Sequence, residues 1–138
     1  MAHSDLFEPL SFAHGPAMKN RFMLAPLTNL QSHPDGRLSD DEFNWLTLRA
    51  KGGFGLTMTC AAHVQQVGQG FPGQLGVFGD QHLEGLTRLA AAIKAQGSRA
   101  ARLSDLETPS VVQQVSLARR VEGSSFEVIG GPIFLMGT

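Results

Sequence analysis

Residues 20–28 read NRFMLAPLT in a chain of 138 residues. The stretch that starts at Met18 ends in the apolar residues Phe22, Met23 and Leu24, directly before Ala25-Pro26. Proline has no backbone N–H to give to a neighbouring strand, so a strand inside a sheet ends before it. The segment therefore predicts a first buried strand over Met18 to Leu24, followed at once by a loop.

An N-terminal β-hairpin is expected just upstream. A short apolar stretch at Leu10-Ser11-Phe12 is separated from Met18 by His14-Gly15-Pro16. Glycine and proline together are a turn signal, because one allows and the other imposes the backbone angles of a tight turn. The two apolar stretches are then the arms of the hairpin.

A capping box marks the start of the first predicted helix. Ser39 can accept a hydrogen bond from the third amide of a helix that begins at Asp40, while Glu42 reaches back to the amide of Ser39. Apolar residues follow at helical spacing, at Phe43, Leu46 and Ala50. Gly52-Gly53 supplies the stop.

The rest of the chain continues this alternation of strands and helices. We expect a strand over Phe54 to Cys60, a loop over Ala61 to Gly79, a helix from Asp80 to Gly97, a strand over Arg99 to Leu103, a helix from Pro109 to Gly123, and a strand over Phe126 to Ile129. Alternation predicts a parallel sheet covered by helices, because each parallel pair needs a crossover. The fold class is α/β, in one domain over residues 1–138. A closed eight-stranded barrel takes about 250 residues, so this sheet is expected to be open.

Composition excludes several classes of function. The net charge is -1, from 11 basic and 12 acidic residues that are scattered along the chain, which disfavours nucleic-acid binding. No apolar stretch approaches the roughly 20 residues of a membrane span, and we expect a cytoplasmic protein. Cys60 is the single cysteine, so no intrachain disulfide and no cysteine-based metal site can form. The five histidines show no paired helical spacing, and no metal site is predicted.

The run at residues 20–28 resembles the first barrel strand of the old yellow enzyme family, in which Asn-Arg and, four residues later, Pro-x-Thr lead into the flavin. LFEPL at residues 6–10 and AKGGFGL at residues 50–56 support the resemblance, which extends to about residue 101. It implies the N-terminal part of an FMN-binding (β/α)8 barrel, with three to four β/α units after the hairpin. It also implies hydride transfer from NAD(P)H through FMN to an activated alkene as small-molecule substrate.

The resemblance assigns cofactor-binding roles to particular residues. Pro26 and Leu27 would give backbone contacts to the isoalloxazine, and Thr28 a hydroxyl near its N5 and O4. Ala61 would lie beside the pyrimidine end of the ring. The alternative for Pro26 and Thr28 is an ordinary turn at the end of a strand.

Beyond residue 101 the sequence departs from the family pattern. The third-strand glutamine and the histidine pair of the family are missing, and the chain contains no tyrosine to act as proton donor. No catalytic residue is therefore assigned, and activity is expected to be impaired. Residues 102–138 resemble a divergent or rejoined later barrel unit, in which Arg102 would stabilise the reduced flavin near N1 and O2. A surface arginine at a frayed strand end is the alternative.

Two other functions stay open at this point. The first is a non-catalytic barrel remnant that self-associates through its open strand edges. The second is an open α/β module that binds a nucleotide through the GxGxxG string at residues 68–73. Three weaker signals each have two interpretations. His63 is either a ligand contact or a structural histidine, and Cys60 is either a small buried residue or a neighbour of the flavin. Gly130-Gly131 forms either a phosphate-binding turn or a plain turn.

Overall fold

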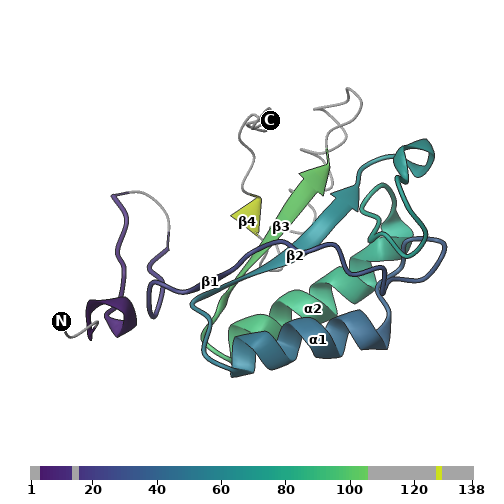
Figure 1. Ribbon diagram of the computed structural model, residues 1–138. Coiled ribbons are helices and arrows are strands. Elements are labelled where there is room, and N and C mark those ends of the chain that lie inside the picture. The colour runs from purple at the N-terminus through teal and green to yellow at the C-terminus, as the bar shows by residue number, and fades with distance from the viewer. Residues whose placement is uncertain (1–3, 14–15, 106–126, 129–138) are drawn as a thin grey trace.

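The computed structural model describes residues 4–13, 16–105 and 127–128. Their elements are the 3-10 helix η1 (Ser4–Phe7), β1 (Met23–Leu24), α1 (Asp40–Lys51), β2 (Leu56–His63), the 3-10 helices η2 (Gln66–Gly68) and η3 (Asp80–His82), α2 (Leu83–Ala95), β3 (Arg99–Asp105) and β4 (Glu127–Val128). The strands form one sheet in the order β1-β2-β3-β4, and all neighbours are parallel (Figure 1). The expected parallel α/β fold is confirmed, and the carboxyl ends of its strands share one edge.

Helix α1 begins where its capping residue predicts. The Ser39 hydroxyl accepts a hydrogen bond from the Glu42 amide at 3.1 Å. The helix ends at Lys51, and after the C-cap Gly52 the chain turns at Gly53, whose φ of +113° is a backbone angle that side chains disfavour. The second half of the predicted capping box is absent, because the Glu42 carboxylate receives hydrogen bonds from other side chains.

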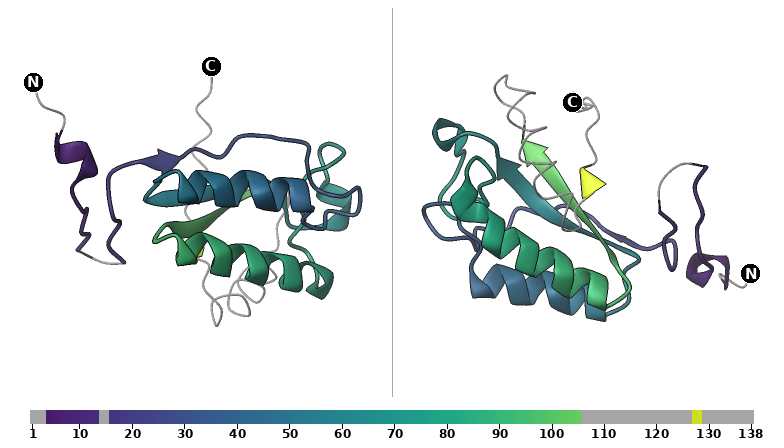
Figure 2. Two further views of the ribbon diagram at one scale, coloured as in Figure 1. Left: turned by 90° about the horizontal axis from the view of Figure 1, so that it is seen from below. Right: turned by 180° about the vertical axis from the view of Figure 1, so that it is seen from behind.

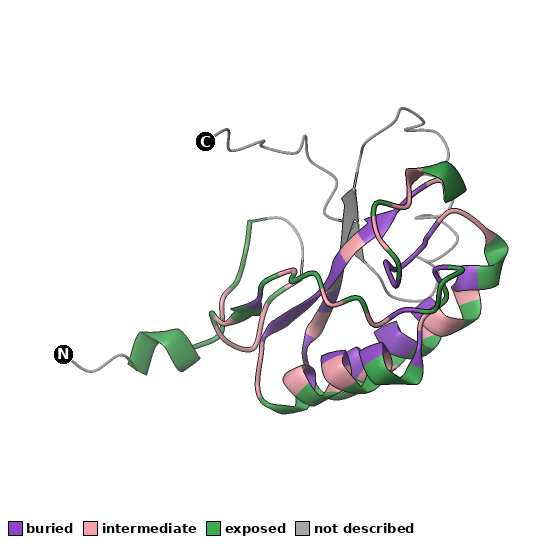
Figure 3. Ribbon diagram, turned by 45° about the vertical axis from the view of Figure 1, so that its right-hand side comes forward, coloured by how far each residue is buried: buried purple, intermediate pink, exposed green. Residues whose placement is uncertain are grey.

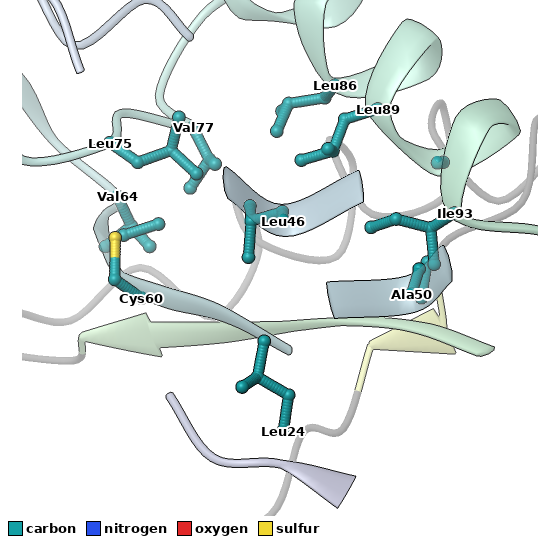
Figure 4. Packing of buried hydrophobic residues seen from close by; sticks show 13 residues of the cluster. Leu24, Leu46, Ala50, Cys60, Val64, Leu75, Val77, Leu86, Leu89 and Ile93 are labelled. Carbon is teal, nitrogen blue, oxygen red and sulfur yellow. The ribbon is translucent and has the colours of Figure 1, made fainter. Parts of the chain in front are cut away.

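Both helices cover the same face of the sheet (Figure 2). Their outer faces are exposed, whereas their inner faces and most of β2 are buried (Figure 3). Leu46 of α1 lies between the side chains of α2 and those of β2 (Figure 4). The helix residues that build this core are Leu46, Ala50, Leu86, Leu89, Ala90 and Ile93, of which all but Leu86 are fully buried.

A bulge in β2 changes which of its residues face the helices. Leu56 pairs with Arg99 and Met58 with Ala101, but the register to β3 shifts before Ala61. Leu56 and Met58 pack with Met18 in a small separate cluster, while Cys60 lies in the main core under the helices. Because side chains alternate along a strand, the extra residue of a bulge moves the following residues to the other face.

Several boundaries differ from those expected. Strand β2 continues past Cys60 to His63, and His63 forms a further parallel bridge with Gly76 inside the expected loop. Strand β3 likewise continues to Asp105. The expected first strand over Met18 to Leu24 is shortened to β1, and the hairpin is a single antiparallel bridge between Leu10 and Met18.

After residue 105 the structure describes only residues 127–128, so few of the expected elements there can be compared with it. The strand expected over Phe126 to Ile129 is present as β4, beside β3. The helix expected from Pro109 to Gly123 and the turn at Gly130-Gly131 lie outside the described residues.

Candidate functional site

The loop that leaves β1 carries three of the predicted cofactor-binding residues. Leu27 is 56% exposed, Thr28 is exposed and Pro26 is half-buried. Within the described part of the chain, neither the Thr28 hydroxyl nor the backbone N–H groups of Leu27 and Thr28 have a hydrogen-bond partner. An apolar surface next to free donors is an arrangement that a planar, polar-edged ligand can use.

Ala61 lies on β2 near the same edge of the sheet. Thr28 follows Leu24 by four residues, and Ala61 follows Thr57, the sheet partner of Leu24, by four as well. Parallel strands end at a common edge, so both residues belong to the carboxyl-end side of the sheet. Ala61 is half-buried, and its carbonyl accepts a hydrogen bond from the Gln74 side chain at 3.4 Å.

Arg102 lies on β3, the strand on the other side of β2. It directly precedes Leu103, the residue that pairs with Ala61, and itself pairs with Val128 of β4. Its side chain lies outside the described part of the structure. The five predicted cofactor residues thus lie on β2, on the adjacent β3, or in the loop that follows the other neighbour of β2, which is β1.

A buried carboxylate supports the loop after β1. Glu42 has no exposed surface, and its oxygens accept hydrogen bonds from Asn29 at 3.3 Å, from Cys60 at 3.2 Å and from Ser32. The sequence pattern suggested only a helix-capping role for Glu42. The polar residues that converge on it are far apart along the chain, so no local pattern reveals the cluster.

Cys60 is a structural thiol. Its side chain is 2% exposed and donates to Glu42. Burial, with the neighbouring Glu42 carboxylate, raises the pKa of the Cys60 thiol to about 12. The thiol therefore stays protonated near neutral pH and is a poor nucleophile, which agrees with its prediction as a small buried residue.

His63 and His82 flank Phe78 beside this edge. The ring centroids of His63 and Phe78 are 5.0 Å apart, and those of Phe78 and His82 are 4.6 Å apart. His63 Nδ1 is paired with the Gln65 carbonyl at 2.8 Å, while its Nε2 is buried without a partner. His63 is therefore a buried structural residue as well as part of the wall of a cavity of about 400 Å³.

That cavity and a neighbouring one are lined by residues other than the predicted cofactor residues of β2 and of the loop after β1. The first is lined by Pro34, Asp35, Arg37, His63, Gln66, Gln69, Phe78 and Gln81. The second has a volume of about 390 Å³ and shares Arg37 and Gln81 with the first. Of the cofactor residues whose side chains are described, namely Pro26, Leu27, Thr28 and Ala61, none lines either cavity. In the part of the chain described, no group of three metal-ligating side chains occurs, and no helix is long and apolar enough to cross a membrane.

The nucleotide-binding string at residues 68–73 lacks the required geometry. A dinucleotide turn leads from a strand directly into a helix that begins inside the glycine motif. Here β2 ends at His63, and α2 begins only at Leu83. The glycines instead build a turn in which Gly70 donates its amide to the Gln74 side chain at 2.7 Å.

We expect stability to fall as the pH drops through the region near 6.5. Burial, and the neighbouring His63, lower the pKa of His82 below its ordinary value of 6.5, with Asp35 and Arg37 acting in opposite directions. The unfolded chain therefore takes up this proton first, and the stability present above pH 6.5 is lost as the pH falls toward the folded pKa. Urea midpoints at about pH 7.5 and about pH 5.5 measure the effect.

A matched pair of variants isolates the contribution of His82. His82→Gln should weaken the pH dependence, whereas His33→Gln, at an exposed position, should leave it as it is. An equal pH dependence in the wild type and in His82→Gln contradicts the assignment to His82.

Comparison with known proteins places these features in a family. Residues 5–109 match the NADH:flavin oxidoreductase / NADH oxidase family. The probable NADH-dependent flavin oxidoreductase YqiG of Bacillus subtilis is 39% identical over 98 residues, which are 71% of this chain and 26% of that protein. The NADH:acrylate oxidoreductase of Vibrio harveyi is 37% identical over 97 residues, 70% of this chain and 10% of that protein. The chain thus spans about a quarter of the first of these relatives.

Solved structures share the fold. A 2-naphthoyl-CoA reductase in complex with 2-naphthoyl-CoA superimposes with a TM-score of 0.69 at 31% identity, over 75% of this chain and 16% of that one. Old yellow enzyme from Pichia sp. AKU4542 gives a TM-score of 0.66 at 20% identity, over 72% and 26%. The second likeness concerns the fold alone. Together these matches confirm the expected fold, a partial (β/α)8 barrel with a parallel sheet.

Proposed function

Because the chain belongs to the NADH:flavin oxidoreductase / NADH oxidase family, we propose that it contributes the first strands of an FMN site in an oxidoreductase of the ene-reductase type. The family consists of flavin-dependent oxidoreductases that use NADH or NADPH. The observation that carries the proposal is the exposed loop after β1, where Leu27 and Thr28 present donors that have no hydrogen-bond partner among the described residues.

The residues at this edge fit the flavin. Pro26 and Leu27 would lie against the isoalloxazine, because they offer an apolar surface and an unused amide. Thr28 would donate its hydroxyl near N5 and O4, which tunes how readily the ring accepts a hydride. Ala61 would contact the pyrimidine end, where a small side chain leaves room. Arg102 would place a positive charge near N1 and O2, where the reduced ring carries negative charge.

The substrate proposed is an activated alkene, with NAD(P)H as electron donor. The Vibrio harveyi relative is named for acrylate, an alkene conjugated to a carboxylate. Bound FMN supplies the chemistry by accepting a hydride and passing it on. This chain contains no tyrosine, and we assign none of its residues to proton delivery.

Removing the Thr28 hydroxyl should weaken FMN binding about fivefold, because a hydrogen bond of this kind contributes about 1 kcal/mol. The variant is Thr28→Val, which keeps the shape of the side chain, and Thr28→Ser should restore the affinity. Thr47→Val is the matched control, since the Thr47 hydroxyl bonds the Phe43 carbonyl on α1, away from the edge. Dissociation constants come from titration of the chain against FMN by fluorescence.

Size-exclusion chromatography with added FMN tests the proposal itself. Stoichiometric flavin absorbance in the protein peak supports the proposal, and a colourless protein peak at saturating FMN contradicts it.

The elution volume from the same column also tests self-association. Met23 on β1 and Leu27 and Leu30 in the loop after it are each at least half exposed. Among the described strands β1 is the end strand of the sheet, and exposed apolar edges favour pairing with another copy.

A further inference from the structure

Among the residues whose burial the structure describes, Glu42 is the only acidic one with no exposed surface. A carboxylate in a protein core is strongly unfavourable unless donors surround it. Three donors do so here, namely the Asn29 amide, the Ser32 hydroxyl and the Cys60 thiol. They come from the loop after β1 and from β2, and neither segment belongs to α1, which carries Glu42.

One oxygen of this carboxylate joins the two segments of the proposed flavin site. Glu42 Oε1 accepts both from Asn29 Nδ2 at 3.3 Å and from Cys60 Sγ at 3.2 Å. Asn29 directly follows Thr28, and Cys60 directly precedes Ala61. Glu42 Oε1 thus holds Asn29 and Cys60, the chain neighbours of Thr28 and Ala61, which we assign to FMN binding.

The second carboxylate oxygen of Glu42 holds the loop after β1 at a later residue, Ser32. Glu42 Oε2 accepts from the Ser32 hydroxyl. The Asn29 side chain, oriented by its bond to Glu42, accepts from the Gln31 amide at 3.2 Å, and Ser39 donates its hydroxyl to the Gln31 carbonyl at 2.6 Å. The loop from Asn29 to Ser32 is therefore fixed to the start of α1 by side chains.

Helix capping does not account for this arrangement. The amide of Glu42 is already capped by Ser39, and the carboxylate does not return to the N-cap residue. A carboxylate near a helix N-terminus is stabilised by the helix dipole without being buried, and Asp40 and Asp41 are exposed there. Its burial and its choice of partners point to the loop.

We infer that Glu42 is a positioning residue that fixes the spacing between Thr28 and Ala61, and so shapes the flavin site. The effect of Glu42 on the flavin site rests on the proposed function, whereas its role in holding the loop after β1 does not. The loop is held whether or not flavin is present, whereas the effect on affinity and on flavin potential requires FMN.

The test is Glu42→Leu, which keeps a side chain of similar size while removing both acceptor oxygens. We expect hydrogen exchange at the Gln31 and Ser32 amides to accelerate at least about tenfold, because bonds to a charged group are lost. Exchange within α2 should change much less. FMN affinity should fall by about tenfold or more, with a shift of the flavin midpoint potential.

Two further variants make the test specific. Glu42→Gln keeps Oε1 as an acceptor for Asn29 and Cys60, so it should recover most of the affinity and potential. Asp41→Leu, at the exposed neighbouring position, should change neither. If Glu42→Leu does not fold, Asn29→Ala removes one donor from the same oxygen and should produce the same local acceleration.

The outcomes separate this inference from the proposed function. Unchanged exchange at Gln31 and Ser32, or acceleration that is equal throughout α2, overturns the positioning role. Local acceleration with unchanged FMN affinity and potential overturns its link to the flavin site. If the wild-type chain binds no FMN, the proposed function fails, while the exchange experiment still decides whether Glu42 positions the loop.

Discussion

Replacing Leu46 by alanine is expected to lower the free energy of unfolding by about 3 kcal/mol. Leu46 has no exposed surface and lies between α2 and β2, at the centre of the layer of side chains under the helices (Figure 4). Truncation removes apolar contacts and leaves a cavity with packed elements on both sides. Neither can collapse freely, because the sheet is held by its backbone ladders and α2 by its own core contacts.

Urea unfolding followed by circular dichroism measures this effect. Leu48→Ala is the matched control, since Leu48 lies two positions along α1 and is 59% exposed. The control should change stability by less than about 0.5 kcal/mol. Equal midpoints for Leu46→Ala and Leu48→Ala would show that the two helices do not form the main core.

The helices were predictable because their signals are local. Ser39 caps the Glu42 amide three residues away, and the apolar positions of α1 and α2 repeat within two turns. Such patterns need no knowledge of the rest of the fold. The parallel topology followed from the alternation of elements, since parallel neighbours require a crossover.

The strand ends were not predictable in this way. Residues 61–63 belong to β2 because they pair with residues 103–105 of β3, and because His63 bridges to Gly76. These partners are distant along the chain, and the glycine-rich sequence after Ala61 indicates a loop. The same limit applies to Glu42, whose three donors lie 10 to 18 positions away.

The candidate site also has a part that the sequence predicted and a part that it did not. The family resemblance supplied roles for Pro26, Thr28, Ala61 and Arg102, and the parallel order of β1, β2 and β3 explains why residues so far apart lie at one edge. The sequence did not indicate what holds the loop after β1 in place. That support consists of tertiary hydrogen bonds from a buried carboxylate and of a close backbone contact at Gly73.

Gly73→Ala should destabilise the chain by roughly 3 kcal/mol, through two effects that add. Gly73 has φ +77°, a conformation that alanine adopts only with strain. An added methyl group would also lie 2.5 Å from the Leu30 carbonyl oxygen. Leu30 is itself at φ +53°, and the next turn of the loop is tied to Gly73, whose carbonyl accepts from the Ser32 amide at 3.0 Å. The loop has little freedom to retreat.

Two other glycines separate these effects. Gly53 has φ +113° with nothing within 4 Å of an added methyl group, so Gly53→Ala should cost about 1 to 2 kcal/mol from backbone strain alone. Gly68 has neither a positive φ nor a neighbour within 4 Å, and Gly68→Ala should be nearly neutral. Thermal and urea unfolding of the three variants should give this order of destabilisation.

The order also bears on the flavin site, because Leu30 lies two residues after Thr28. If the contact with Gly73 helps to place the loop, Gly73→Ala should weaken FMN binding more than Gly53→Ala does, even where both variants are fully folded. A cost for Gly73→Ala no greater than that for Gly53→Ala would mean that the Leu30 backbone yields easily. In that case the loop after β1 is positioned by its hydrogen bonds rather than by the close contact of Gly73 with Leu30, and loss of the bonds to Glu42 should move Thr28 more than Gly73→Ala does.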